Sequence, residues 1–112
     1  MLELTIKPGE LDNLKALIRE MVESTQASEP GALDYEWFFD ADEKTCHIWE
    51  RNANSAAAMT HLGHFGEKFA ERFMAALEPT RFIVYGNPND EVQEALSDFD
   101  VAYLAPFAGF AR

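Results

Sequence analysis

The spacing of hydrophobic and polar residues changes once in the first third of the chain, and this change separates a strand from a helix. Residues 2–6 alternate between apolar and polar side chains, which is typical of a strand with one buried face. After Pro8-Gly9, apolar residues recur every three or four positions from residue 10 to about residue 27, which predicts an amphipathic helix. Glu29-Pro30-Gly31 is expected to end this helix and turn the chain.

The next two segments, residues 32–40 and 44–51, predict a β-hairpin. Both are rich in aromatic and β-branched side chains, and the acidic segment 40–43 between them is expected to form the turn. If the turn is centred on residue 42, two pairs of side chains lie opposite one another: Trp37 with His47, and Tyr35 with Trp49. Such pairs can stabilise a sheet or line a pocket, and the sequence leaves both interpretations open.

A second long helix is predicted over residues 54–78. Asn54-Ser55 is a helix-start signal, and three alanines follow it. Pro79 is expected to terminate the helix because it follows Glu78 and disfavours the helical conformation there. Two glycines, Gly63 and Gly66, are expected to kink the helix near its middle.

This helix also carries the main candidates for chemistry. With helical spacing, three phenylalanines fall on one stripe, and His61 and Leu62 lie at its N-terminal end: Phe65, Phe69 and Phe73. His64 follows His61 after one turn. A titratable pair at the end of an aromatic stripe can be a pocket wall or an ordinary helix edge, and this segment alone does not decide between them.

The last third of the chain adds two strands and a short helix. Residues 81–85 predict a strand, and Asn89-Asp90 is expected to cap a helix that runs to about residue 97. Residues 101–107 predict a final strand, which should lie at a sheet edge or end at Pro106 because proline cannot donate a ladder hydrogen bond.

The order of elements predicts a single α+β domain over residues 1–112. The order β-α-β-β-α-β is that of the split βαβ, ferredoxin-like fold, here with an extra C-terminal helix and strand. In that fold two helices cover one face of a four-stranded antiparallel sheet. Large apolar residues point to both sides of the predicted strands. The uncovered sheet face is therefore expected to bind a partner, most simply a second copy in a homodimer.

Composition excludes several classes of partner. Twenty acidic residues against nine basic residues give a formal net charge of −11, which argues against nucleic acid or an anionic membrane surface as a partner. No apolar run is long enough to span a membrane. The only cysteine, Cys46, cannot form an internal disulfide, and we interpret it as a structural strand residue in a cytoplasmic protein.

Several of these residues together resemble the antibiotic biosynthesis monooxygenase-like family of dimeric α+β barrels, which includes small quinol monooxygenases. The residues that carry the resemblance are Glu29-Pro30-Gly31, Leu33, Tyr35, Glu50-Arg51, Ala57, His61-Leu62 and Phe65. The resemblance spans about residues 1–86, and the remaining tail is similar to a subgroup that ends in the same way. It implies a homodimer through the sheet faces and a pocket between the sheet and the second long helix.

The resemblance also implies a chemistry. Monooxygenases of this family oxidise quinols or other electron-rich aromatic substrates without flavin, haem or metal, so no cofactor is expected. His61 matches the family's helix histidine and is the candidate catalytic residue, because an imidazole can accept a phenolic proton near neutral pH. Tyr35 and Phe65 match positions that wall the pocket. Trp37, Trp49 and His64 are added as candidate substrate-binding residues from proximity alone.

Two positions bear on the choice of activity within the family. Asn52 stands where members often carry an aromatic residue that lines the active site of some monooxygenases. The haem-degrading branch typically uses an asparagine on the first strand, and residues 2–6 contain none, which argues against haem degradation.

Three functions remain open at this stage. The first is a cofactor-independent monooxygenase of a small aromatic or quinol. The second is a non-catalytic dimer that binds a small apolar or aromatic molecule. The third is a metal-dependent or other histidine-based enzyme that uses His61 and His64, with Glu67 or Glu71 completing the site.

Overall fold

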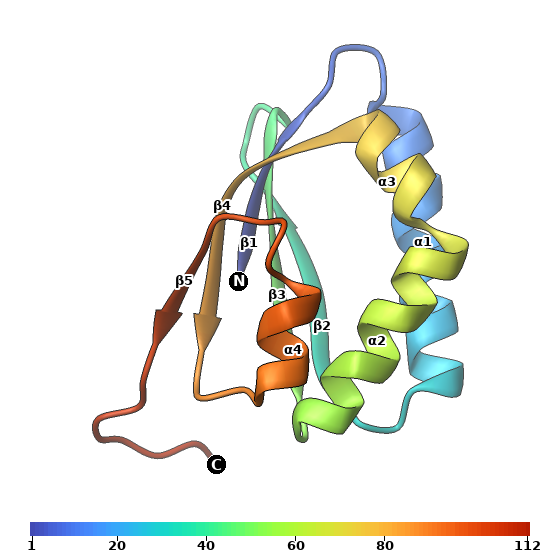
Figure 1. Cartoon of the computed structure of the whole chain (residues 1–112). Coiled ribbons are helices and arrows are strands. Elements are labelled where there is room, and N and C mark those ends of the chain that lie inside the picture. The colour runs from blue at the N-terminus through green and yellow to red at the C-terminus, as the bar shows by residue number, and fades with distance from the viewer.

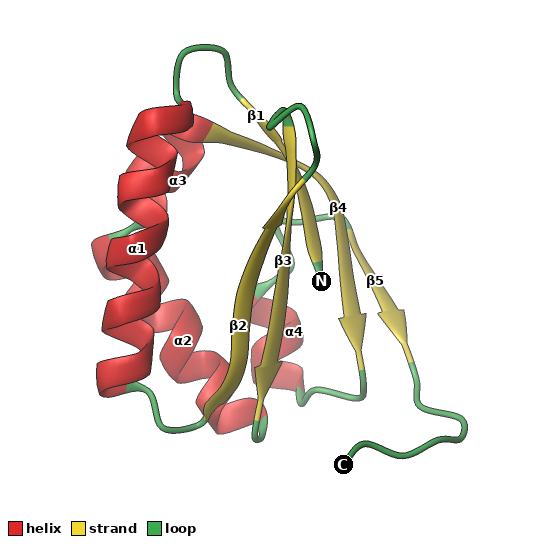
Figure 2. Ribbon diagram, turned by 180° about the vertical axis from the view of Figure 1, so that it is seen from behind, coloured by secondary structure: helices red, strands yellow, loops and turns green.

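The chain forms one five-stranded sheet with helices packed on one of its faces. A computed structural model describes residues 1–112, the whole chain. In chain order the elements are β1 (Leu2–Ile6), α1 (Leu11–Ser28), β2 (Ala32–Phe39), β3 (Thr45–Asn52), α2 (Ser55–Lys68), α3 (Ala70–Ala76), β4 (Leu77–Tyr85), α4 (Asp90–Ala95) and β5 (Val101–Leu104). Figures 1 and 2 show the helices on one side of the sheet and an uncovered sheet face on the other.

The strand order is β2-β3-β1-β4-β5. The first four strands pair in antiparallel fashion in the ferredoxin-like order, and β5 runs parallel to β4 at the edge of the sheet. The connection between β4 and β5 contains α4, which packs beside α2 on the helical side (Figure 1). The predicted ferredoxin-like α+β fold with an added C-terminal helix and strand is confirmed.

The hydrophobic core lies between the sheet and two of the helices, α1 and α3. The first contributes Leu14, Leu17 and Met21, and the second contributes Phe73 and Ala76. In contrast, α2 has no buried residue along its whole length. The core is therefore closed under α1 and α3, whereas α2 contacts β2 and β3 without a fully buried residue. None of the helices combines the length and the apolar character that crossing a membrane requires.

Cys46 belongs to this core. Its side chain on β3 is 1% exposed, and burial raises the pKa of the thiol to about 12, with the negative charge of Asp40 adding to the effect. A thiol held protonated in this way is a small apolar side chain, which agrees with the structural role predicted for it.

The second long helix differs from the prediction in where it breaks. The break lies at Phe69 (φ −127°, ψ −18°), not at Gly63 or Gly66, and it separates α2 from α3. Phe69 is 8% exposed and packs in the core together with Phe73. The change of direction lets α3 place Phe73 and Ala76 in the core, while the residues of α2 are at most partly buried.

Pro79 does not terminate the helix as predicted, since α3 ends at Ala76 and Pro79 lies inside β4. It pairs with Leu4 of β1, next to a register shift that leaves Thr80 without a paired residue. The Thr80 hydroxyl donates to the carbonyl of Glu3 over 3.2 Å. A bulge of this kind accommodates a proline in a strand because the ladder is already interrupted there.

The hairpin register also differs from the prediction, by one residue. Trp37 pairs with Ile48 rather than His47, and Tyr35 pairs with Glu50 rather than Trp49. The cause is the turn, in which the Asp40 carboxylate accepts hydrogen bonds from the backbone N–H groups of Lys44 and Thr45 over 2.9 and 3.1 Å. Since paired residues share a face, the shift places Trp49 on the opposite face of the sheet from Tyr35.

The C-terminal strand lies at the edge of the sheet, as Pro106 suggested, but it ends at Leu104 rather than residue 107. The residues after it extend away from the sheet (Figure 1). Two apolar side chains in this tail, Phe107 and Phe110, are 102% and 83% exposed.

Candidate functional site

A cavity of about 450 Å³ lies between the sheet and α2. Most of its lining is apolar, with aromatic side chains from the sheet, from α2 and α3 and from the segment after α4: Tyr35, Phe65, Phe73, Phe82 and Phe99. Only two lining residues, Glu50 and His61, carry a carboxylate or an imidazole. This size and lining are typical of a small-molecule site, in which a few polar groups orient an otherwise apolar ligand.

His61 lies between two carboxylates. Its Nδ1 atom is 2.9 Å from Oε1 of Glu29, and its Nε2 atom is 3.2 Å from Oε1 of Glu50. The His61 side chain is 12% exposed, and that of Glu50 is 35% exposed. Both ring nitrogens can donate to these carboxylates only when the imidazole is protonated.

These contacts change the charge of His61. Burial by itself would lower the pKa of His61, but the hydrogen bonds and negative charges of Glu50 and Glu29 outweigh burial and raise this pKa to about 9. His61 is therefore an imidazolium at neutral pH. It acts as a hydrogen-bond donor and a positive charge rather than as the free proton acceptor that its ordinary pKa would allow.

Glu29 is the buried anchor of this cluster. Its side chain is 4% exposed, and its second oxygen, Oε2, is 3.1 Å from Nδ1 of His64. Glu29 follows the last turn of α1, where its backbone N–H donates to the carbonyl of Thr25. One carboxylate thus holds both histidines of α2.

Gly31 explains how the loop after Glu29 comes so close to α2. A Cβ atom at Gly31 would lie 2.6 Å from Cβ of Ala57, so only glycine fits there without a shift. The start of α2 is fixed by Asn54, whose side chain accepts from the N–H of Ala57 over 2.8 Å. Three of the residues that carried the family resemblance therefore contact His61: Glu29, Tyr35 and Glu50.

Two of the predicted pocket residues, Tyr35 and Phe65, line the inner cavity. The ring of Tyr35 meets that of His61 edge-on, with 5.2 Å between centroids, and Phe65 lines the cavity. Burial is the main cause that raises the pKa of Tyr35 above its ordinary value, with the charge of Glu50 contributing. Tyr35 is thus a neutral, partly apolar wall at physiological pH.

Two other predicted residues do not line the cavity. Trp37 packs edge-on against Phe73 and Tyr35, and its buried Nε1 atom has no hydrogen-bond partner. His64 is bound to Glu29 and contributes nothing to the cavity lining.

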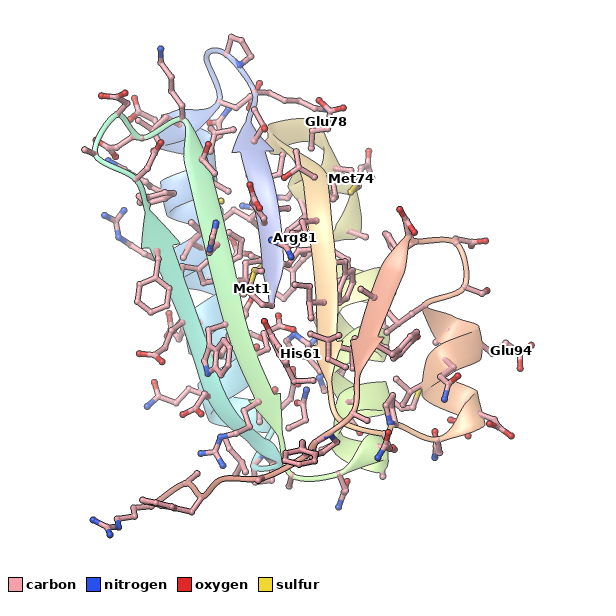
Figure 3. The ribbon with its side chains drawn as sticks, turned by 90° about the vertical axis from the view of Figure 1, so that its left-hand side faces the viewer. Met1, His61, Met74, Glu78, Arg81 and Glu94 are labelled. Atoms are coloured by element: carbon pink, nitrogen blue, oxygen red, sulfur yellow. The ribbon has the colours of Figure 1, made fainter.

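Trp49 lies on the outer sheet face, where its ring is 6.0 Å from that of Tyr85. These two residues line a second cavity of about 260 Å³, which opens where β3 and β4 extend past the start of β1. In Figure 3 His61 is seen between the ribbons of β3 and β4, beyond the end of β1 at Met1. His61 and Glu50 line both cavities, so they separate the outer one from the inner one.

The sequence-based prediction did not include Glu29 and Glu50 among the site residues. Both belong to the motifs that carried the resemblance, and this was the available signal. A carboxylate is seldom buried unless it is paired, so a sequence alone favours the surface for both. No group of three or more His, Cys, Asp or Glu side chains is arranged to hold a metal ion.

Known proteins share this fold. The sequence profile of the antibiotic biosynthesis monooxygenase family matches residues 1–65. The crystal structure of MupZ from Pseudomonas fluorescens superposes with a TM-score of 0.85 at 22% identity, over 99% of this chain and 90% of that chain. This match therefore includes α4 and β5.

Two further structures match a smaller part. A candidate antibiotic biosynthesis monooxygenase from Bacteroides thetaiotaomicron gives a TM-score of 0.60 at 27% identity, over 70% of this chain and 80% of that one. Rv0793 from Mycobacterium tuberculosis gives a TM-score of 0.54 at 21% identity, over 70% of this chain and 86% of that one. None of the curated proteins compared with this chain matches it significantly.

Proposed function

Because the chain belongs to the antibiotic biosynthesis monooxygenase family, we propose that it oxidises a small aromatic or quinol-type substrate with molecular oxygen and without a bound cofactor. The proposed site is the inner cavity between the sheet and α2. The observation that carries the proposal is the placement of one imidazole, His61, and one carboxylate, Glu50, in a wall that is otherwise largely apolar.

The proposed role of His61 is to stabilise the substrate anion. A phenolic hydroxyl that enters the cavity takes the place of Glu50 at Nε2 of His61, and Glu50 accepts its proton. The electron pair stays on the substrate oxygen, which then accepts the N–H of His61. The substrate supplies all the electrons that reduce molecular oxygen. One oxygen atom enters the product, and the other leaves as water together with the two hydrogens that the substrate loses, so that a hydroquinone yields a hydroxyquinone.

Oxygen uptake tests the proposal. We expect the purified protein to consume oxygen with a panel of hydroquinones and naphthols, and mass spectrometry to show a product with one oxygen atom more and two hydrogen atoms fewer than the substrate. A side chain at Gly66 should block the reaction, because this residue lines the cavity and a Cβ there meets no atom within 4 Å. Gly66→Leu is therefore the test variant, and Glu67→Leu, at an exposed position outside the lining, is its control.

The result that would overturn the proposal is ligand binding without oxygen uptake. If hydroquinones bind to the cavity in the parent protein and are displaced in Gly66→Leu, but no oxygen is consumed, the protein is a small-molecule-binding member of the family. The apolar cavity supports that second function equally well, and only the pair His61 and Glu50 favours catalysis.

We also propose that two copies associate through the uncovered sheet faces. Exposed apolar side chains on this face support the proposal, with exposed fractions from 41% to 55%: Phe38, Trp49, Tyr85 and Leu104. An obligate interface of this kind buries on the order of 2,000 Å² or more in total. Sedimentation at micromolar concentration should show a dimer, and Trp49→Glu should shift it toward monomer. A monomeric parent protein would refute this part.

A further inference from the structure

Glu29 is unusual among the charged residues because it is almost fully buried and both of its oxygens are used. Glu29 is 5% exposed, and its oxygens contact Nδ1 of His61 over 2.9 Å and Nδ1 of His64 over 3.1 Å. Burying an ionised carboxylate is unfavourable unless its partners are charged or donate hydrogen bonds. Glu29 therefore favours the form of His61 that carries a proton on Nδ1.

The second nitrogen of His61 faces Glu50. The contact of Nδ1 with Glu29 restrains the orientation of the ring. Nε2 lies 3.2 Å from Glu50, and both residues line the two cavities. The groups that face His61 come from three elements besides its own: Glu29 after α1, Tyr35 on β2 and Glu50 on β3. His64, on the same helix, reaches Glu29 rather than His61.

Glu50 is the replaceable partner of the two. Its side chain is 35% exposed, whereas that of Glu29 is 4% exposed and lines neither of the two cavities. An anion in the cavity can thus exchange with Glu50 at Nε2, while Glu29 continues to compensate the charge of the ring. Glu29, the buried partner, therefore keeps the proton on Nδ1, and a ligand can displace Glu50, the exposed partner, from Nε2.

From this geometry we propose that Glu29 is a positioning residue that keeps His61 protonated on both ring nitrogens, so that the inner cavity binds phenols as their phenolate anions. The proposal deepens the proposed function, on which it rests for the class of ligand. It concerns binding and ionisation only, and no turnover is needed to test it. The bound oxygen atom of the phenolate accepts the N–H of Nε2, and the phenol's proton leaves to Glu50 or to solvent.

The probe is para-nitrophenol, because its ionised form absorbs visible light and its neutral form does not. We expect the bound probe to ionise at lower pH than the free probe when the parent protein is in excess. In Glu29→Gln, which keeps the shape of the side chain but removes its charge, we expect ionisation of the bound probe to shift up by about one pH unit or more. Glu23→Gln, at an exposed position of α1, should leave it unchanged.

Histidine NMR gives a second readout that a merely structural role would not move. In the parent protein the His61 ring should carry protons on both nitrogens at pH 7, and in Glu29→Gln its titration should move down toward that of an ordinary histidine. His64→Ala, which keeps the contact between Glu29 and His61, should preserve the high midpoint. The exposed His47 provides an internal reference.

The proposal is overturned if the parent binds para-nitrophenol in its neutral form, or if Glu29→Gln changes neither the probe nor the His61 titration. If Glu29→Gln does not fold, the parent titration decides, since a His61 that is neutral at pH 7 contradicts the proposal. A charged His61 that binds phenolates, in a protein that consumes no oxygen, would keep this inference and remove the proposed oxidation.

Discussion

The two ends of the helical layer are packed in opposite ways. Over α1 and α3, apolar side chains fill the space above the sheet, and Leu14 and Leu17 are 0% and 1% exposed. Over α2 no residue is buried, and the space is a cavity of about 450 Å³ that contains His61. One end therefore stabilises the fold, and the other keeps room for a ligand. The break at Phe69 makes this division possible, because it lets the chain pack at α3 without closing the cavity at α2.

A leucine-to-alanine substitution at each of the two ends should give the largest difference in the free energy of unfolding. Leu17→Ala removes a fully buried side chain and should lower the free energy of unfolding by about 2–5 kcal/mol. Leu62→Ala removes a partly exposed side chain that already borders both cavities, and should cost about 1 kcal/mol or less. Urea denaturation measures both, and equal losses would mean that α2 packs as tightly as α1.

The cavity end should also respond to pH. The pKa of His61 is raised in the folded protein to about 9, so its contribution to stability is complete below pH 6.5 and is lost as pH rises through 9. The expected loss is up to about 3 kcal/mol. Denaturation from pH 6 to pH 8 measures the first part of this loss before the thiol of Cys46, whose ordinary pKa is near 9, ionises in the unfolded chain. His61→Gln should lack this loss. If the free energy of unfolding falls equally with pH in both proteins, a group other than His61 causes the loss.

Catalysis should depend on His61 and much less on His64. His61→Ala removes the donor at the cavity wall and should lower turnover roughly 10²-fold, the lower end of the range for removing a hydrogen-bond donor to a developing anion. His64→Ala should have a smaller effect, because His64 contacts Glu29 but no cavity. Oxygen uptake measures both variants. Full activity of His61→Ala would refute its catalytic role.

The smallest effect is expected at the contact that brings the two ends together. Gly31→Ala places a Cβ 2.6 Å from that of Ala57, so the loop must move away from α2. We expect a loss of about 1–2 kcal/mol, near the lower end of the range for overpacking. The same shift should carry Glu29 away from His61 and lower the midpoint of the His61 titration. An unchanged titration would show that the loop and the histidine are independent.

The fold could be predicted from the sequence because its signals are local. The alternation in residues 2–6 predicted β1, and the helical spacing of residues 10–27 predicted α1. Asn54 indicated the start of α2. The hairpin register could not be predicted, since it depends on which backbone N–H groups the Asp40 carboxylate binds. The predicted position of the kink in the second long helix was wrong because the core packing of Phe69 outweighed the local preference of the glycines.

The candidate site was predicted only in part, for a physical reason. His61 could be proposed from the family resemblance, and Tyr35 and Phe65 from the same motifs. The importance of Glu29 depends on contacts with residues 32 and 35 positions away, and that of Glu50 on a contact between a strand and the following helix, and periodicity describes neither. Trp49 was placed on the wrong side of the sheet because one residue of register decides the face of every side chain in a strand.

The most direct test of the account is a crystal structure with para-nitrophenol bound. We expect the ring of the probe in the inner cavity beside Phe65, with its phenolic oxygen within hydrogen-bonding distance of Nε2 of His61 and with Glu50 displaced. The contradicting result is a probe in the outer cavity, against Trp49 and Tyr85, with the contacts of His61 to Glu29 and Glu50 unchanged. In that case the space beside α2 is not the ligand site.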